Sequence, residues 1–351
     1  MAKKAGKNEV QFNYAAELRR LKEQGPERLY LLWGPEDYLR EQFLMQLKKK
    51  CLPEGEDDFS YKRMDGPGLD AARLQEAVDA MPFMTERSFV ELRNVDINRL
   101  AEPEVCAKIL ADIPEYCTLA FIQNAQYEPD GRLRFVKALR SEGYELKFTR
   151  QSQGMLTDWI VRRFAAAGKG IELAAAQRLI FISGDLMSRL IPEIEKIAAY
   201  ARGDKVTPAD VEAVANHIPE AVVFEMTELI AQKKMNSALA VLAELLADKN
   251  NEPIMMIAVL GRQMRQLYAA RLALDKNLGT KYIVEVCALK SDYIASKLTA
   301  AARGYTLSQL RRAVELCTET EYRMKSSGAD ARELLKEAVL RIAAGEDHGS
   351  D

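Results

Sequence analysis

The sequence predicts an α/β domain built on a five-stranded parallel sheet, followed by two all-helical domains. Short apolar runs alternate with helical periodicity from Arg28 to about Arg150, and strand signals fade after Gln151. The composition changes again near His217–Pro219, and 351 residues are more than one hydrophobic core usually supports. We therefore divide the chain into a lead-in (1–27), an α/β domain (28–150), a first helical domain (151–217), a second and larger helical domain (218–344) and a polar tail (345–351).

The α/β domain is expected to alternate strands with helices. Five apolar runs are predicted as strands: Leu29–Trp33, Tyr61–Asp65, Phe89–Arg93, Leu119–Gln123 and Tyr144–Phe148. Four amphipathic stretches are predicted as helices: Tyr38–Lys50, Asp70–Ala80, Glu104–Ile113 and Arg132–Ser141. In the first helix Leu39, Phe43, Leu44 and Leu47 share one face, as an amphipathic helix requires. Strands joined through helices in this way form βαβ units, in which neighbouring strands run parallel.

After Gln151 each periodic segment predicts a helix. The first helical domain is expected to contain Ser152–Ala167, Ala174–Ser183, Met187–Ala201 and Pro208–Asn216, and the second Val222–Lys233, Asn236–Asp248, Pro253–Lys276, Ser291–Ala302, Leu307–Lys325 and Asp330–Ala344. Two helix starts carry a capping signal. Thr207 precedes Pro208, so its hydroxyl can accept from a free N–H group of the first turn. Thr306 and Gln309 form the pattern of a capping box.

The segment after the first strand stands where a nucleotide-binding loop is expected, but it lacks the residues for that chemistry. Such a loop needs the pattern G-x-x-x-x-G-K-[ST]. Its glycines let backbone N–H groups approach the phosphates, its lysine neutralises phosphate charge, and its hydroxyl binds magnesium. Gly34 is present, but Leu39 replaces the second glycine, Arg40 the lysine and Glu41 the hydroxyl. The carboxylates of Glu36 and Asp37 inside the loop would also repel phosphates. The sequence therefore predicts a nucleotide-binding fold without a cofactor.

Composition argues against several other classes of protein. The net charge is −2, so any contact with DNA must come from local patches. The five cysteines lack the spacing of a disulfide framework or a zinc site, which fits a reducing cytoplasm. His217 and His348 are isolated in the sequence, so neither a catalytic nor a metal site is expected. No stretch reaches the roughly 18 apolar residues of a spanning helix, so membrane insertion is not expected.

Several motifs together carry a family resemblance. They are Leu31-Leu32-Trp33-Gly34 followed by Tyr38-Leu39, the segment from Met81 to Arg87, the run Pro192–Ile197, Val223-Phe224, and Lys325-Ser326-Ser327-Gly328. From about Arg28 to Ala343 the chain resembles the delta subunit of bacterial DNA polymerase III. It departs from the family at Pro192, a position that is commonly Asn, and at Pro35 inside the acidic loop. Both departures concern local structure.

The resemblance implies an AAA+-like first domain, a helical lid and a helical collar. It also implies a clamp-loader subunit that opens the ring-shaped sliding clamp (beta) without hydrolysing ATP itself, within a DNA polymerase holoenzyme. The implied partners are the gamma/tau and delta prime subunits, reached through the collar, and primer–template DNA within the complex. No membrane partner is implied, and the implied location is the cytoplasm.

The segment Met81-Pro82-Phe83-Met84 is the predicted clamp-binding site. Pro82 stops continuation of the preceding helix and would present Phe83 at a tip. On the residues alone, these side chains would suit the domain core at a helix end equally well. The resemblance favours the first alternative, because the family carries at this position a hydrophobic wedge that enters a pocket on the clamp. Aromatic and methionine side chains bury a large area and adapt to irregular pockets.

Two other functional hypotheses are an active AAA+ ATPase with an atypical loop and a generic helical scaffold without an exposed wedge. An ATPase needs an apolar strand that ends in paired carboxylates for magnesium, whereas two strands here end in Arg93-Asn94 and Gln123-Asn124. The loop Lys325-Ser326-Ser327-Gly328 is expected to be a helix end with Gly328 as a left-handed cap. Its alternative role is a contact with DNA.

Overall fold

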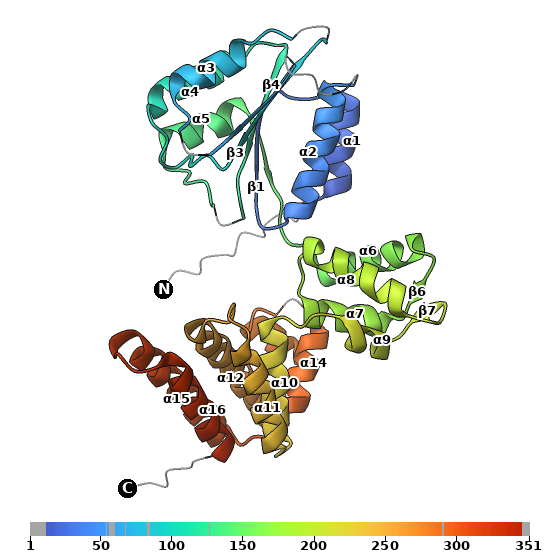
Figure 1. Cartoon of the computed structure of the whole chain (residues 1–351), viewed down its shortest axis with the longest axis vertical. Coiled ribbons are helices and arrows are strands. Elements are labelled where there is room, and N and C mark those ends of the chain that lie inside the picture. The colour runs from blue at the N-terminus through green and yellow to red at the C-terminus, as the bar shows by residue number, and fades with distance from the viewer. Residues whose placement is uncertain are drawn as a thin grey trace. The chain divides into compact units, whose positions relative to one another are not determined.

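The computed structural model describes residues 12–53, 55, 60–66, 68–82, 85–125, 127–289 and 291–345. The chain forms two compact units. The first comprises the residues up to Gln151 together with Leu186–Ser188, and the second comprises Ser152–Asp185 and the residues from Arg189 onward. The first unit is an α/β structure, and the described part of the second is helical except for one pair of two-residue strands (Figure 1).

The first unit is built on a sheet of five parallel strands in the order β2-β3-β4-β1-β5 (Figure 1). The strands are β1 (Leu29–Trp33), β2 (Tyr61–Asp65), β3 (Ser88–Arg93), β4 (Cys117–Ile122) and β5 (Tyr144–Lys147). All five predicted strands are confirmed, with ends displaced by at most two residues. Because β1 lies between β4 and β5, the loop that follows β1 is at a point where the strand order reverses. Open parallel sheets use such points for ligand binding.

Helices cover both faces of this sheet. They are α1 (Tyr14–Gln24), α2 (Asp37–Cys51), α3 (Ala71–Asp79), α4 (Pro103–Ala111) and α5 (Arg134–Glu142). Figure 1 shows α1 and α2 on one face and α3, α4 and α5 on the other. Helix α1 was not predicted, because it is rich in charged residues and buries only Leu21. The side chain of Asn13 caps it, and the Tyr144 hydroxyl donates to the Glu17 carboxylate at 2.8 Å.

Side chains of the buried strand β1 point alternately into two cores. Leu29, Leu31 and Trp33 pack into the cluster that includes residues of α3, α4 and α5. Tyr30 points to the opposite face and meets the ring of Phe43 on α2, with 6.2 Å between ring centroids. This alternation follows from the two-residue period of a strand. It fixes the register of β1 and thereby the position of the loop that follows it.

Helices α6 to α9, which we call the lid helices, begin the second unit. They are α6 (Gln153–Ala166), α7 (Leu173–Ser183), α8 (Met187–Tyr200) and α9 (Pro208–Val214), and all four were predicted. The parallel strands β6 (Gly170–Ile171) and β7 (Lys205–Val206) were not predicted, because two residues are too short to show an alternating pattern. The Thr207 cap is confirmed as a full capping box with Asp210.

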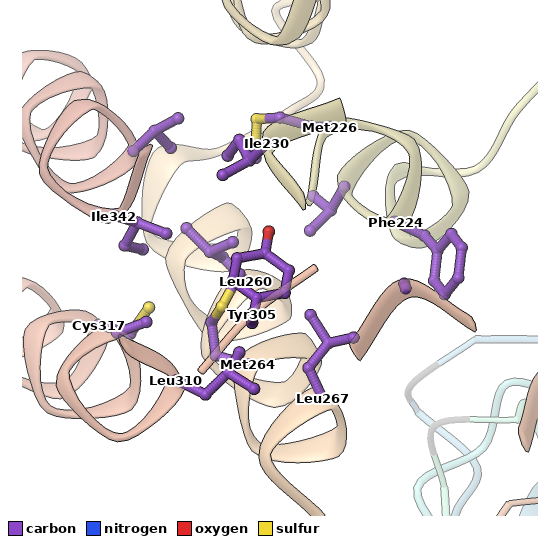
Figure 2. Close-up of a cluster of buried hydrophobic side chains, with 14 of the residues drawn as sticks. Phe224, Met226, Ile230, Leu260, Met264, Leu267, Tyr305, Leu310, Cys317 and Ile342 are labelled. Carbon is purple, nitrogen blue, oxygen red and sulfur yellow. The ribbon is translucent and has the colours of Figure 1, made fainter. Parts of the chain in front are cut away.

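Helices α10 to α16, which we call the collar helices, follow. They are α10 (Pro219–Ala231), α11 (Met235–Ala247), α12 (Pro253–Asp275), α13 (Thr280–Val286), α14 (Asp292–Ala302), α15 (Leu307–Ser326) and α16 (Ala331–Ala344). All except α13 were predicted, and the capping box of Thr306 and Gln309 is confirmed. Their shared core surrounds α12, where Leu260, Met264 and Leu267 are buried (Figure 2). None of the described helices is long and apolar enough to cross a membrane.

Phe181 of α7 joins the lid helices to the collar helices. Its ring meets Phe224 of α10 and Tyr293 of α14 edge-on, at centroid distances of 5.1 and 5.9 Å. At the next residue of α7, the carbonyl of Ile182 accepts a hydrogen bond from the backbone N–H of Ile218 at 2.7 Å. Edge-on aromatic pairs add about 0.5–1.5 kcal/mol each beyond the area that they bury. The end of α7 is therefore packed against two collar helices.

Candidate functional site

The loop between β1 and α2 lies against the chain that leaves β5. Gly34 has a φ of +120°, and a Cβ at this position would lie 2.5 Å from the carbonyl oxygen of Phe148. Only glycine combines this backbone conformation with such a close approach. The Phe148 N–H in turn donates to the carbonyl of Trp33 at 2.7 Å. The one glycine that the loop keeps from the phosphate-binding pattern thus has a structural reason to be there.

Backbone N–H groups of this loop are used within the first unit. Pro35 has no N–H, and the N–H of Glu36 donates to the carbonyl of Phe148 at 3.0 Å. The N–H of Asp37 donates to the carbonyl of Pro35 at 3.2 Å, and that of Tyr38 to the Asp37 carboxylate at 2.9 Å. A phosphate-binding loop turns such groups toward its ligand. In this loop they satisfy oxygens of the chain itself.

Leu39 and Arg40, which replace the second glycine and the lysine of the pattern, are both buried. The Arg40 guanidinium donates from Nη1 to the carbonyl of Gly34 at 2.9 Å. Burial lowers the pKa of Arg40, and the carboxylates of Glu41 and Asp37 act in the opposite direction. In a working loop the lysine reaches the β- and γ-phosphates. Here the corresponding cation is bound by the loop backbone.

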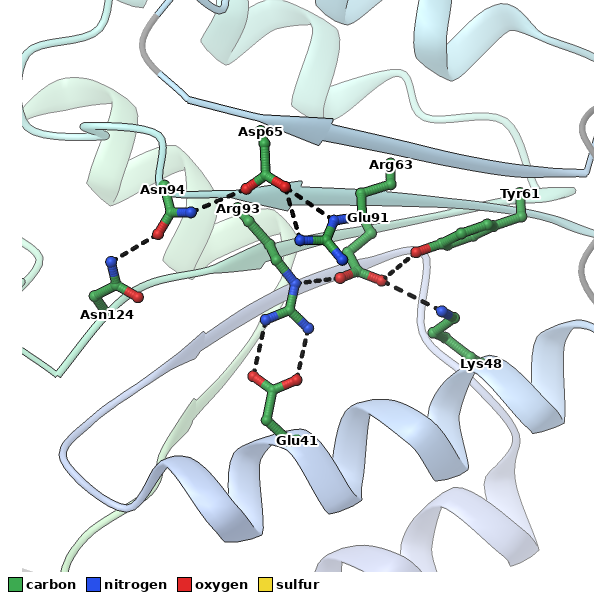
Figure 3. A network of polar contacts seen from close by, with 9 residues as sticks. All are labelled: Glu41, Lys48, Tyr61, Arg63, Asp65, Glu91, Arg93, Asn94 and Asn124. Carbon is green, nitrogen blue, oxygen red and sulfur yellow. Dashed lines mark hydrogen bonds and ion pairs between the residues drawn. The ribbon is translucent and has the colours of Figure 1, made fainter. Parts of the chain in front are cut away.

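Glu41, which replaces the hydroxyl of the pattern, binds Arg93 at the end of β3 (Figure 3). The Arg93 guanidinium donates from Nη1 and Nη2 to the two carboxylate oxygens, at 2.9 and 2.6 Å. Such two-pronged pairs are among the stronger hydrogen bonds in proteins. An ATPase would place a magnesium-binding hydroxyl at the first position and a magnesium-binding carboxylate at the end of such a strand. In this chain the side chains at these two positions are hydrogen-bonded to each other.

Arg93 also pairs with Glu91, a carboxylate that is only 1% exposed. Glu91 accepts a hydrogen bond from the Tyr61 hydroxyl at 2.8 Å and lies 3.6 Å from the Lys48 ammonium (Figure 3). Burial alone would raise the pKa of Glu91, but the hydrogen bonds from Arg93 and Tyr61 and the nearby positive charges hold it below its usual value. The ionised carboxylate therefore links α2, β2 and β3.

Polar contacts continue along the carboxyl ends of β2, β3 and β4. Arg63 binds Asp65 through two hydrogen bonds, the Asn94 amide donates to Asp65 at 2.9 Å, and the Asn124 amide donates to Asn94 at 2.6 Å (Figure 3). Among the described residues, no group of three or more His, Cys, Asp or Glu side chains could hold a metal ion. Side chains at the loop and at this edge of the sheet thus bind one another and the loop backbone. The residue types at positions 41 and 93 are unlike those of an ATPase in the sequence alone, but the pair of Arg93 and Glu41 was not predicted.

The predicted clamp-binding segment follows α3. Helix α3 ends at Asp79, and Ala80 is extended with φ −63° and ψ 112°. Met81 is 77% exposed, so its side chain does not belong to the core, and Pro82 is half-buried. Phe83 and Met84 lie outside the described residues. The segment thus begins on the surface, as the wedge hypothesis requires of Met81.

The loop Lys325-Ser326-Ser327-Gly328 lies at the end of α15 and is exposed. The Lys325 ammonium pairs with Glu321 at 2.6 Å. The hydroxyls of Ser326 and Ser327 donate to backbone carbonyls one turn earlier, at 2.8 and 2.7 Å. The expectation of a left-handed cap at Gly328 was wrong, because its φ is not positive, and the helix ends instead with the N–H of Ser327 donating to the carbonyl of Arg323 at 3.0 Å. These contacts describe a helix end, and a DNA contact here stays a prediction.

Comparisons with known proteins agree over most of the chain. The family model for the DNA polymerase III delta subunit matches residues 30–149, and the model for the C-terminal domain of that subunit matches residues 220–342. DNA polymerase III subunit delta of Bacillus subtilis (strain 168) is 25% identical over 327 residues, covering 90% of this chain and 92% of the relative. A probable DNA polymerase III subunit delta of Aquifex aeolicus (strain VF5) is 23% identical over 295 residues, covering 81% and 82%. The solved structure of the Bacillus subtilis DNA clamp loader delta protein (YqeN) matches with a TM-score of 0.51 at 20% identity, covering 95% of this chain and 100% of that chain, which supports the fold.

Proposed function

This chain belongs to the family of DNA polymerase III delta subunits, and from this premise we propose that it binds the sliding clamp through Met81-Pro82-Phe83-Met84 and opens the ring without hydrolysing ATP. The observation that carries the proposal is the exposed Met81 directly after the end of α3. Contiguous apolar patches on the surface of soluble proteins mark interaction sites, and the sequence places Pro82, Phe83 and Met84 directly after Met81. Pro82 restricts the backbone beside it and reduces the conformational freedom that is lost on binding.

The opening of the ring is proposed to be a shift of an equilibrium. A closed clamp and a clamp with one sprung interface differ in free energy, and a ligand that prefers the sprung form moves the population toward it. The size of the shift is limited by the difference in affinity of the wedge for the two forms. Ring opening by this mechanism requires no chemical reaction, which agrees with a binding site made of apolar side chains.

The absence of ATP hydrolysis is proposed from the loop after β1. Its N–H groups, Arg40 and Glu41 are bound to other parts of the first unit, so a nucleotide would have to displace several hydrogen bonds at once. Each net hydrogen bond is worth about 0.5–1.5 kcal/mol, and charged ones more. An active ATPase with an atypical loop is therefore the weaker proposal.

The collar helices are proposed to join this chain to the gamma/tau and delta prime subunits, and the assembled loader to hold primer–template DNA. Their large shared core makes them a stable platform, which an oligomer interface needs. The exposed helix end at Lys325–Gly328 remains the proposed DNA-proximal loop.

A nucleotide-free unloading assay tests the clamp proposal. The sliding clamp of the same organism, labelled and loaded on nicked circular DNA, is mixed with the purified chain, and the loss of clamp from the DNA is followed with time. The chain should bind the clamp and speed its release without ATP. Release at the spontaneous rate, with no detectable complex, would overturn the proposal. Met255→Ala, which truncates an exposed methionine of α12, is the matched control and should behave like the wild type.

A further inference from the structure

Tyr116 bridges the two ends of the chain that flank the proposed clamp-binding segment. Its hydroxyl donates to the backbone carbonyl of Asp79, the last residue of α3, at 3.2 Å. Its own backbone carbonyl accepts from the N–H of Ser88, the first residue of β3, at 2.8 Å. The ring packs against the core beneath α3, α4 and α5. One residue therefore ties the point where the chain leaves α3 to the point where it enters β3.

Thr85 makes a second tie on the β3 side of the segment. Its Oγ1 donates to the carbonyl of Arg87 at 2.9 Å, and it lies 2.7 Å from the hydroxyl oxygen of Ser60. Because Thr85 has one proton to donate, the Ser60 hydroxyl acts as the donor in this contact. Ser60 is 1% exposed, and its carbonyl accepts from the N–H of Phe89 at 2.7 Å. Thr85 is thereby fixed to the edge of the sheet.

We propose that Tyr116 and Thr85 are positioning residues that hold the clamp-binding segment in its binding conformation before the clamp arrives. The inference rests on the proposed function of Met81-Pro82-Phe83-Met84. A loop with free ends spends only part of its time in the conformation that fits a pocket, and its apparent affinity falls by that fraction. Fixing both ends raises the fraction without any new contact with the partner. In this scheme Tyr116 and Thr85 act through the segment and do not touch the clamp.

The location of the Tyr116 hydroxyl separates positioning from general stability. Its bond to Asp79 lies on the exposed surface, where water can replace it after a mutation. Carbonyls in the last turn of a helix are commonly satisfied by water, so loss of this bond costs little folding free energy. The effect of this hydrogen bond is to restrict the direction in which the backbone leaves α3.

The test removes the two hydroxyls in the full-length chain. Tyr116→Phe and Thr85→Val should each weaken binding to the purified clamp roughly three- to tenfold, the loss expected for one hydrogen bond. The loss should appear mainly as slower association in surface plasmon resonance. The melting temperature of Tyr116→Phe should be unchanged, because its hydrogen bond is exposed to water, whereas Thr85→Val also removes a partner of the buried Ser60 hydroxyl and should lower the melting temperature. Thr85→Ser keeps the hydroxyl and should restore binding. Tyr144→Phe is the matched control, since its hydroxyl binds Glu17 elsewhere in the same unit, and it should bind like the wild type.

A double-mutant cycle with Phe83→Ala shows whether Tyr116 acts through the segment. If it does, Tyr116→Phe should have a much smaller effect when Phe83 is already truncated. Wild-type affinity in both hydroxyl variants, or strictly additive losses in the cycle, would overturn the positioning role. If the wild-type chain fails to bind the clamp, or Phe83→Ala binds normally, it is the proposed function that fails, and the two results are therefore distinguishable.

Discussion

Arg93 and Glu41 bind each other through two hydrogen bonds, 2.9 and 2.6 Å long, although they are 52 residues apart in the chain. Glu41 stands in the first turns of α2, and Arg93 ends β3. In an ATPase of this fold the corresponding positions hold magnesium together. The pair thus connects helix and sheet at the place where a nucleotide would otherwise connect them.

The first prediction concerns nucleotide. The purified chain should neither hydrolyse ATP nor gain thermal stability from millimolar Mg-ATP, because Arg40 and Glu41 are engaged within the first unit. A ligand present at 100 times its dissociation constant would add about 2.7 kcal/mol. Differential scanning fluorimetry with and without Mg-ATP measures this, and a clear rise in melting temperature would contradict the prediction.

The second prediction concerns the stability of the pair. Arg93→Ala should cost about 3–5 kcal/mol of unfolding free energy, because it leaves the buried Glu91 carboxylate short of its main partner. Glu41→Gln should cost only about 1 kcal/mol, since the Glu41 side chain is 42% exposed. Urea denaturation gives both values. Arg132→Ala removes an arginine whose side chain is 90% exposed, and it should change stability little. Equal losses at Arg93 and Glu41 would refute this ranking.

The third prediction concerns pH. The pKa of Glu91 is lowered in the folded state, so its stabilising contribution is fully present above the unfolded pKa of about 4.3 and is lost as the pH falls through the folded pKa. The stability difference between the wild type and Glu91→Gln should therefore narrow on acidification from pH 5 to lower values. Urea midpoints measured across this range provide the test. A difference that stays constant, or grows, would show that Glu91 is not held ionised by its partners.

The fourth prediction concerns the wedge. Phe83→Ala should weaken clamp binding by roughly 2–4 kcal/mol, the range for a central aromatic anchor, and should barely change fold stability. If Phe83 belonged to the core, truncation would instead cost about 3–5 kcal/mol of folding free energy. Calorimetry of clamp binding and urea denaturation are run on the same variant. A protein that melts much earlier but binds normally while folded would end the wedge hypothesis.

The fifth prediction concerns assembly. A fragment that ends at Ile218 keeps the α/β unit and the lid helices but loses the shared core of the collar helices. It should fold and bind the clamp, yet fail to elute with the other loader subunits. Because truncation exposes Phe181, the variant Phe181→Ser in the fragment guards against aggregation. Entry of the fragment into the complete loader would contradict the role proposed for the collar.

Local sequence patterns predicted most of the helices and strands, but they did not predict the side-chain contacts between these elements at the site. The buried faces of α2 and β1 were visible because apolar residues recur with the period of each element. Helix α1 was not predicted because most of its residues are polar or charged and Leu21 is its one buried residue. The pair of Arg93 and Glu41 depends on how β3 and α2 meet in space, which no local pattern contains. The same holds for the hydroxyl of Tyr116 on the carbonyl of Asp79.

The packing of Phe181 between Phe224 and Tyr293 has a mechanical consequence. Two helical bundles connected only by a flexible linker would rotate freely about it. A movement of one bundle would then not be passed on to the other. Here rotation about residues 216–218 must first pull an aromatic ring out from between two helices. The lid helices and the collar helices are therefore coupled at α7 by side-chain packing as well as by the covalent chain.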